Sequence, residues 1–135
     1  MERKTSANVE TIQRLYQALS QGDVQGMAAV CTAEVRWEIT PGFPHSATFV
    51  GLEAVFNDFF VPVMEEFEDW RTVPETFLDA GDDVIALGHY HSRAKATGRY
   101  MTAGFAHVWS LDDGKAARLR HYADTVQLYR ALDRL

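Results

Sequence analysis

The chain has 135 residues, of which 47% are hydrophobic and 24% charged, and a formal net charge of −6. The length predicts a single domain, residues 1–135, with its own hydrophobic core. The negative charge and the absence of a run of Lys or Arg argue against nucleic acid and membranes as partners. The polar opening "MERKTSANVE" and the lack of a long apolar stretch predict a cytoplasmic protein. The single cysteine, Cys31, excludes an internal disulfide.

Two helices are expected near the start of the chain. Residues 8–19 carry apolar side chains at helical spacing, and Ser6 or Asn8 can serve as the N-cap. A shorter helix over residues 24–31 follows, with Asp23 as its cap. Because few residues separate them, the two helices are expected to form a hairpin.

The next segments predict a strand, a loop and a third helix. Residues 34–39 alternate polar and apolar side chains, which predicts a strand with Trp37 facing inward. The turn residues of "TPGFP" end this strand. Residues 51–67 return to helical spacing, and Pro62 is expected to kink or split the helix.

From about residue 70 the pattern changes to strands separated by short polar turns. The segments "WRTVPETFLDA", "VIALGHYHSRAK", "RYMTAGFAHVWSL" and "AARLRHYADTVQLY" each fit a strand, and the last runs into a short helix. Helices followed by a meander of long strands predict an α+β fold, with helices on one side of an antiparallel sheet.

This order of elements, together with "VIALGHYHSR", "FAHVWSLDDGK" and "RHYADTVQLYRAL", resembles the SnoaL-like polyketide cyclases. That group belongs to the ketosteroid isomerase-like superfamily. The resemblance implies a cystatin-like cone, in which a strongly curved antiparallel sheet wraps around a pocket closed by about three N-terminal helices. It also implies a homodimer through the outer sheet face and a reaction that needs no cofactor and no metal. One fold of this kind carries several chemistries, so the resemblance predicts the fold better than the reaction.

The closing strand supplies the first catalytic candidate, Asp124, which shares a strand face with Arg120 and Tyr122. In the family that the chain resembles, an aspartate at this position points into the cone and serves as an acid or base in several members. A carboxyl group on an apolar wall has a raised pKa, which suits a general base. The alternative is that Asp124 caps the following turn or pairs with Arg120.

A second candidate is His107, which shares a face with the bulky Phe105 and Trp109. On the inner face, a neutral imidazole among aromatic side chains can donate a hydrogen bond to a carbonyl oxygen or move a proton. In the opposite register, His107 lies on the outer sheet face.

The motif "GHYHSR" places His89 and His91 on one side of a strand, and they are further catalytic candidates. A three-residue turn, 96–98, brings them onto the face of His107, whereas a two-residue turn separates them. If the three share a face, they have suitable spacing for zinc or iron. The resemblance argues against a metal, and the plain alternative is a sheet face with hydrogen-bonded histidines.

The remaining pocket lining is expected to be aromatic, which favours a flat apolar ligand. The expected substrate-binding residues are Tyr16, Trp37, Phe56, Phe60, Phe105, Trp109 and Tyr122. The leading hypothesis is a cofactor-independent enzyme that moves protons on a small apolar carbonyl compound, in an aldol-type cyclisation or an isomerisation. The alternatives are a non-catalytic module that binds a small lipophile or a dimerisation partner, and a metalloenzyme with histidine ligands. Phe43 and His45, in the proline-rich loop, are candidates to gate the pocket.

Overall fold

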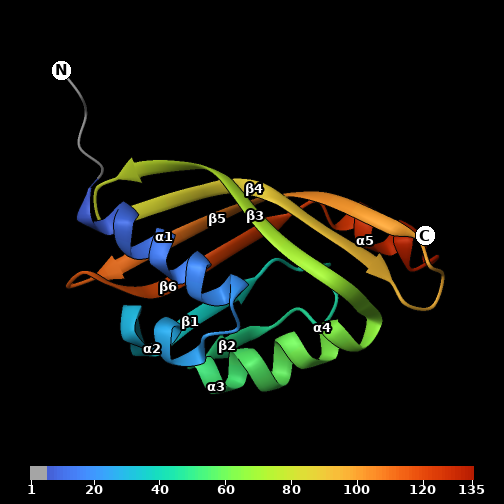
Figure 1. Cartoon of the computed structure of the whole chain (residues 1–135), viewed down its shortest axis with the longest axis horizontal. Coiled ribbons are helices and arrows are strands. Elements are labelled where there is room, and N and C mark those ends of the chain that lie inside the picture. Colours follow the sequence, from blue (N-terminus) through green and yellow to red (C-terminus); the bar gives the residue numbers. More distant parts are fainter. Residues whose placement is uncertain (1–5) are drawn as a thin grey trace.

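Six strands form one curved sheet in the order β2-β1-β6-β5-β4-β3 (Figure 1). The computed structural model describes residues 6–135, so the first five residues of the polar opening lie outside the described part. The strands are β1 (Cys31–Ile39), β2 (Thr48–Val50), β3 (Phe67–Ala80), β4 (Asp83–Ala94), β5 (Tyr100–Asp112) and β6 (Lys115–Ala123). Four of the strand pairs are antiparallel, and β1 runs parallel to β6.

The α+β fold with a curved sheet is therefore confirmed, with two details that the pattern did not predict. One is β2, whose three residues are too few to show an alternating pattern. The other is the parallel pair. It joins β1 to β6 although β2, the helical segment 52–66 and the strands β3 to β5 lie between them in the chain.

The two predicted N-terminal helices are present as α1 (Ala7–Ser20) and α2 (Val24–Val30). The Ser6 side chain accepts a hydrogen bond from the Val9 N–H and so caps α1. The Asp23 side chain does the same for α2 through the Gly26 N–H. In Figure 1, α1 lies across one face of the sheet.

The third predicted helix is continuous but changes its hydrogen-bond pattern. It consists of α3 (Leu52–Ala54), the π-helical η1 (Val55–Phe60) and α4 (Val61–Glu66). Pro62, in the first turn of α4, has no N–H to donate, and the π-helical turns directly precede it. The expected kink or split therefore takes the form of a π-helical segment. A last helix, α5 (Thr125–Ala131), follows β6.

Alternation along β4, β5 and β6 sorts side chains onto two faces of the sheet. We call the face toward α1 the inner face and the opposite one the outer face. The buried inner side chains of the three strands include Val84, Ala86, Tyr90, Ala103, Phe105, His107, Trp109, Leu119 and His121. Val35, Trp37 and Ile39 of β1 are also buried, as predicted.

Two bulges interrupt the pairing of β3 with β4. The register shifts by one residue between Glu68 and Arg71, and again between Pro74 and Thr76. Asp69, inside the first bulge, has a left-handed backbone with φ of 54°. Bulges of this kind bend a strand and redirect its side chains, and Trp70, Arg71 and Thr72 of this bent segment border the cavity described below.

A single glycine allows β3 to approach β4 closely beside the second bulge. Gly88 of β4 pairs with Pro74. A Cβ atom on Gly88 would lie 2.1 Å from the carbonyl oxygen of Val73 and 2.8 Å from the Phe105 ring. Only glycine fits this position without moving the backbone.

No helix within residues 6–135 has the length and apolar character needed to cross a bilayer.

Candidate functional site

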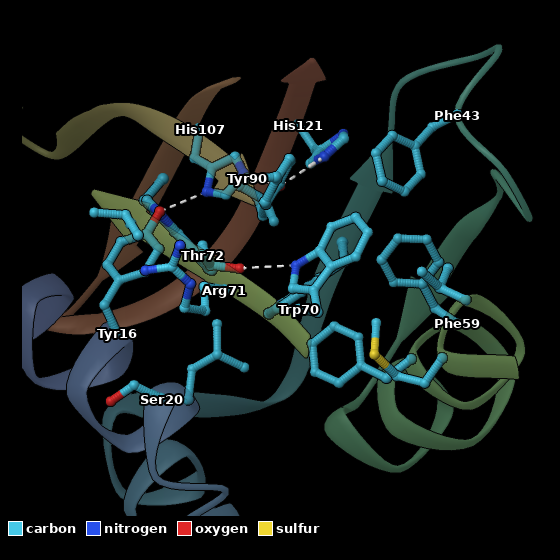
Figure 2. Close-up of a pocket in the computed structure, with 18 residues that line it drawn as sticks. Tyr16, Ser20, Phe43, Phe59, Trp70, Arg71, Thr72, Tyr90, His107 and His121 are labelled. Atoms are coloured by element: carbon cyan, nitrogen blue, oxygen red, sulfur yellow. Dashed lines mark hydrogen bonds between the residues drawn. The ribbon is translucent and has the colours of Figure 1, made fainter. Parts of the chain in front are cut away.

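A cavity of about 520 Å³ lies between the inner face, α1 and the helix from η1 to α4 (Figure 2). Eight of its 18 lining residues are Phe, Tyr or Trp: Tyr16, Trp37, Phe43, Phe59, Phe60, Trp70, Tyr90 and Trp109. Its polar lining residues are Ser20, Arg71, Thr72, His107 and His121. Among the described residues that line it, none is a carboxylate. Such a wall suits an apolar ring system with a few polar groups.

Four polar side chains form a hydrogen-bonded chain along the inner face. The Tyr16 hydroxyl lies 2.5 Å from Nδ1 of His107, and the Tyr90 hydroxyl lies 2.6 Å from Nε2 of the same ring. Nε2 of His121 lies 2.9 Å from the Tyr90 hydroxyl. Figure 2 shows the chain running along the cavity wall from Tyr16 to His121. Both nitrogens of His107 are therefore occupied by tyrosine hydroxyls.

Two N–H groups end this chain, and neither can accept a hydrogen bond. The indole Nε1–H of Trp109 donates to the Tyr16 hydroxyl oxygen at 2.9 Å. At the other end, the backbone N–H of Thr40 donates to Nδ1 of His121 at 3.4 Å. The donor at the His121 end sets the direction of the bonds along the chain, because an imidazole that accepts at Nδ1 carries its proton on Nε2. The Tyr16 oxygen accepts from Trp109 in either direction.

Burial keeps all four groups uncharged near neutral pH. It raises the pKa values of the Tyr16 and Tyr90 hydroxyls well above their usual range, with the hydrogen bond from Trp109 acting in the opposite direction on Tyr16. Burial also lowers the pKa of His107 well below its usual value, and that of His121 to about 4. Each imidazole therefore carries one proton, on one nitrogen only.

One proton on each imidazole, together with the hydrogen-bond partners, assigns the position of every proton in the hydrogen-bonded chain. Nδ1 of His121 accepts from Thr40, so its proton is on Nε2 and is donated to Tyr90. The Tyr90 hydroxyl then donates to Nε2 of His107, whose own proton is on Nδ1 and is donated to Tyr16. The Tyr16 oxygen accepts from both His107 and Trp109. The Tyr16 hydroxyl hydrogen is left without an acceptor among the described residues, on a side chain that lines the cavity.

Five of the residues expected at the site line this cavity: Tyr16, Trp37, Phe60, His107 and Trp109. Phe105 is buried directly behind it, with its ring stacked on His107 at a centroid distance of 4.0 Å. Phe56 contacts Phe60 from outside the cavity. Phe105 and Phe56 support the wall and do not form its surface.

The prediction that Asp124 points into the cavity is wrong. Asp124 is exposed at the N-cap position of α5, and its carboxylate accepts a hydrogen bond from the Gln127 side chain at 3.2 Å. Tyr122, on the same face, is 52% exposed and lies outside the cavity. Side chains alternate between the two faces along a strand. The inward position of His121 therefore places Tyr122, one residue later, and Asp124, three residues later, toward the other face. Arg120 pairs with Asp83 and not with Asp124.

The expectation that His89 and His91 could share a face with His107 is also wrong. The Ala94 N–H donates to the Arg99 carbonyl oxygen, so the turn between β4 and β5 closes around four residues, 95–98. Arg93 therefore pairs with Tyr100, and the two histidines pair with Gly104 and Thr102. They lie on the outer face and contact Glu75 and Thr102. The three histidines therefore do not converge, and no group of three or more potential metal ligands occurs within residues 6–135.

Sequence reasoning missed two members of the hydrogen-bonded chain, Tyr90 and His121. His121 follows Leu119 at strand spacing, while Arg118 and Arg120 occupy the alternate positions. Leu119, the one apolar side chain among these residues, was the available indication that its alternating set faces inward. Tyr90 gave no such signal, because apolar residues occur in both phases of β4.

The loop candidates Phe43 and His45 have different positions. Phe43 is buried in the cavity wall, with its ring 4.8 Å from that of His121. His45 lies outside, where its Nε2 is 2.8 Å from the Glu66 carboxylate. The loop is thus attached to α4 beside the cavity, and Phe43 covers the His121 end.

Comparisons with known proteins agree with this architecture. A family model for the SnoaL-like domain matches residues 12–119. No curated protein sequence matches the chain.

Solved structures match nearly the whole chain. An NTF2-like protein from Burkholderia thailandensis is 26% identical, with a TM-score of 0.88 over 95% of this chain and 98% of its own. TerC, co-crystallized with polyporic acid, is 27% identical, with a TM-score of 0.84 over 95% and 99%. A candidate SnoaL-like polyketide cyclase from a Jannaschia species is 19% identical, with a TM-score of 0.79 over 96% of each chain. This last likeness concerns the fold alone.

Proposed function

Because the chain belongs to the SnoaL-like domain family, we propose that it is a cofactor-independent cyclase or isomerase acting on a small apolar carbonyl compound. The aromatic cavity would hold the ring system of the substrate. The Tyr16 hydroxyl would donate a hydrogen bond to the reacting carbonyl oxygen. This assignment replaces the earlier expectation of Asp124 as the active group.

The proposal is carried by the position of the Tyr16 hydroxyl in the cavity wall, where the proton assignment leaves its hydrogen without an acceptor among the described residues. The bonds from His107 and Trp109 hold the hydroxyl oxygen in place before a ligand binds. A donor fixed in advance stabilises negative charge that develops on a carbonyl oxygen, and it needs no reorganisation during the reaction. Since burial raises the pKa of Tyr16, the hydroxyl would keep its proton and act as a hydrogen-bond donor.

The chemical step would proceed through an enolate. A C–H proton beside the carbonyl is lost to water, and the carbonyl oxygen takes the negative charge next to the Tyr16 hydroxyl. In an isomerisation, the enolate regains a proton from water at a different carbon. In a cyclisation, the enolate carbon attacks a second carbonyl carbon of the same molecule, and the resulting alkoxide takes a proton from water.

The absence of a carboxylate from the described cavity lining narrows the class of compounds that can react there. No carboxylate lines the cavity among the described residues, and both nitrogens of His107 are already bonded. The site therefore suits carbon acids whose enolate is already stabilised, by a second carbonyl group or by an aromatic ring, because these need only a weak base.

The test is a deuterium-exchange measurement with 2-tetralone, whose C1 hydrogens lie between an aromatic ring and a carbonyl group. Proton NMR in D2O follows the loss of the C1 signal with and without protein. We expect exchange to be faster with the protein, and Tyr16→Phe to lower the protein-dependent rate about a hundredfold. The matched control is Tyr122→Phe, which removes the same atom from the outer face and should leave the rate unchanged. Equal rates for the two variants would contradict the role of Tyr16.

A second candidate function is a binding module of the same fold. It is favoured by the same absence of a lining carboxylate, which leaves the cavity without an evident base. In this case, 2-tetralone would quench tryptophan fluorescence on binding, and the protein would not accelerate its exchange.

We also propose that the protein acts in the cytosol as a homodimer through the outer face. Exposed apolar side chains on the outer face, including Leu87 and Tyr122, support the homodimer. Sedimentation equilibrium should give a dimer for the natural chain and a monomer for Leu87→Glu. A natural chain that sediments as a monomer would contradict it.

A further inference from the structure

Arg71 is a cation on the wall of an otherwise uncharged cavity. It is the first residue of β3 that pairs with β4 after the bulge following Glu68, and it is exposed. Figure 2 shows its guanidinium among the lining residues, on the Tyr16 side of the cavity. The two lining histidines are neutral near pH 7, since burial lowers the pKa of each.

Arg71 has no carboxylate partner within residues 6–135, unlike most arginines of the chain. Arg36, Arg93, Arg99, Arg118, Arg120 and Arg134 each lie within 4.0 Å of a carboxylate oxygen. The side chain of Arg71 makes no hydrogen bond to any other described residue. Since the chain has a net charge of −6, acidic partners are plentiful, yet none reaches this position.

The other unmatched polar groups of the cavity wall are also donors. The Tyr16 hydroxyl hydrogen has no acceptor, and the buried Nε1–H of Trp37 has none within the described part of the chain. A guanidinium adds several more N–H groups and a positive charge. A ligand that satisfies this wall must therefore bring acceptor oxygens, and an ionised oxygen satisfies it best.

We propose that the cavity binds its ligand as an anion, an aromatic compound with an ionised oxygen such as a carboxylate or an enolate, and that Arg71 pairs with this oxygen. This inference rests on the proposed function, because it names the charge state of that substrate. Arg71 is then the residue that distinguishes anionic from neutral ring compounds.

The test compares two probes with the same ring, 2-naphthoate and the neutral 2-acetylnaphthalene, at pH 7.5 and low salt. All three tryptophans of the chain line the cavity, so quenching of their fluorescence reports occupancy directly. We expect the natural chain to bind naphthoate more tightly than the ketone. Arg71→Gln should weaken naphthoate about fivefold to tenfold and leave the ketone within twofold, and Arg71→Lys should restore most of the affinity. Added salt should reduce the preference, because Arg71 is exposed.

Arg14→Gln is the matched control, since it removes the same charge from an exposed position of α1 outside the cavity lining. Its affinities should equal those of the natural chain. Equal losses for both probes in Arg71→Gln, or no loss for naphthoate, would overturn the proposal. Thermal unfolding of each variant identifies a purely structural role, which would lower stability without changing the preference between probes. If the protein prefers naphthoate to the ketone but does not accelerate deuterium exchange of 2-tetralone, the proposed reaction is refuted and this inference stands.

Discussion

Histidines on the two faces of the sheet have opposite surroundings, although neighbouring strands carry them. On the inner face, His107 and His121 are buried and bonded to tyrosine hydroxyls. On the outer face, His89 and His91 are partly exposed and contact Glu75 and Thr102. The residue type is the same, but only the inner pair belongs to a connected network in an enclosed site. The side of the sheet, and not the presence of a histidine, decides which of them can take part in chemistry.

The close contact between β3 and β4 keeps the two faces of the sheet separate. Gly88→Ala should break this contact. The new Cβ would lie 2.1 Å from the Val73 carbonyl oxygen, a distance that backbone atoms cannot tolerate. We expect a loss of at least about 3 kcal/mol in the free energy of unfolding, measured in urea. Gly104→Ala is the control, because a Cβ there would meet its nearest atom at 3.9 Å. Similar stability of the two variants would show that β3 can move away without cost.

Removing one histidine from each face should sharpen the comparison. His107→Ala deprives the Tyr16 and Tyr90 hydroxyls of a partner and leaves space beside them. The expected loss is about 3 kcal/mol. His91→Ala, on the outer face, should change the free energy of unfolding by less than about 0.5 kcal/mol. Equal losses at both positions would mean that the inner network adds nothing to stability.

The buried pair should also make stability depend on pH. Burial lowers the folded-state pKa of His121 to about 4, whereas the unfolded value is about 6.5. Below pH 6.5 the unfolded chain binds a proton that the folded chain excludes, so stability is full above this pH and falls as the pH drops toward 4. For His121 alone, the loss between pH 7.5 and pH 5 is about 2 kcal/mol. Urea midpoints at several pH values should fall less steeply for His121→Gln, and parallel curves would contradict a neutral, buried His121.

The smallest effect is expected at the exposed end of β6. Asp124 sits at the N-cap of α5 without making a capping bond, so Asp124→Ala should change the unfolding free energy by less than about 0.5 kcal/mol. The comparison is Asp23→Ala, which removes a real cap from α2 and should cost about 1 kcal/mol. The Asp124 variant should also exchange 2-tetralone at the natural rate. A large loss of exchange would restore Asp124 as a catalytic residue.

The sequence predicted the helices because their signals are local. Ser6 and Asp23 cap the helices that the apolar spacing indicates, and Trp37 faces inward as its alternating strand requires. Each of these features depends on a few neighbouring residues, so the fold class could be predicted without knowledge of the packing.

The site could be predicted only in part, because it depends on which face each strand turns inward. Alternate residues of β4 form two sets, one with Ala86 and Tyr90 and the other with Leu87 and His89. The two sets are similarly rich in apolar residues. The length of the loop at residues 95–98 selects between them, and its sequence does not reveal how the turn closes. In β6, the resemblance to a family favoured the phase of Asp124, while burial selects that of Leu119 and His121.

The two borders of the sheet bear on how copies of the chain can meet. At one border β2 has only three residues, and at the other β3 carries two bulges and Pro74, which has no N–H to offer. Short, bent or proline-containing borders are poor templates for adding a further strand. The fold therefore guards against open-ended strand-by-strand aggregation, and any pairing of two copies must bring broad surfaces together.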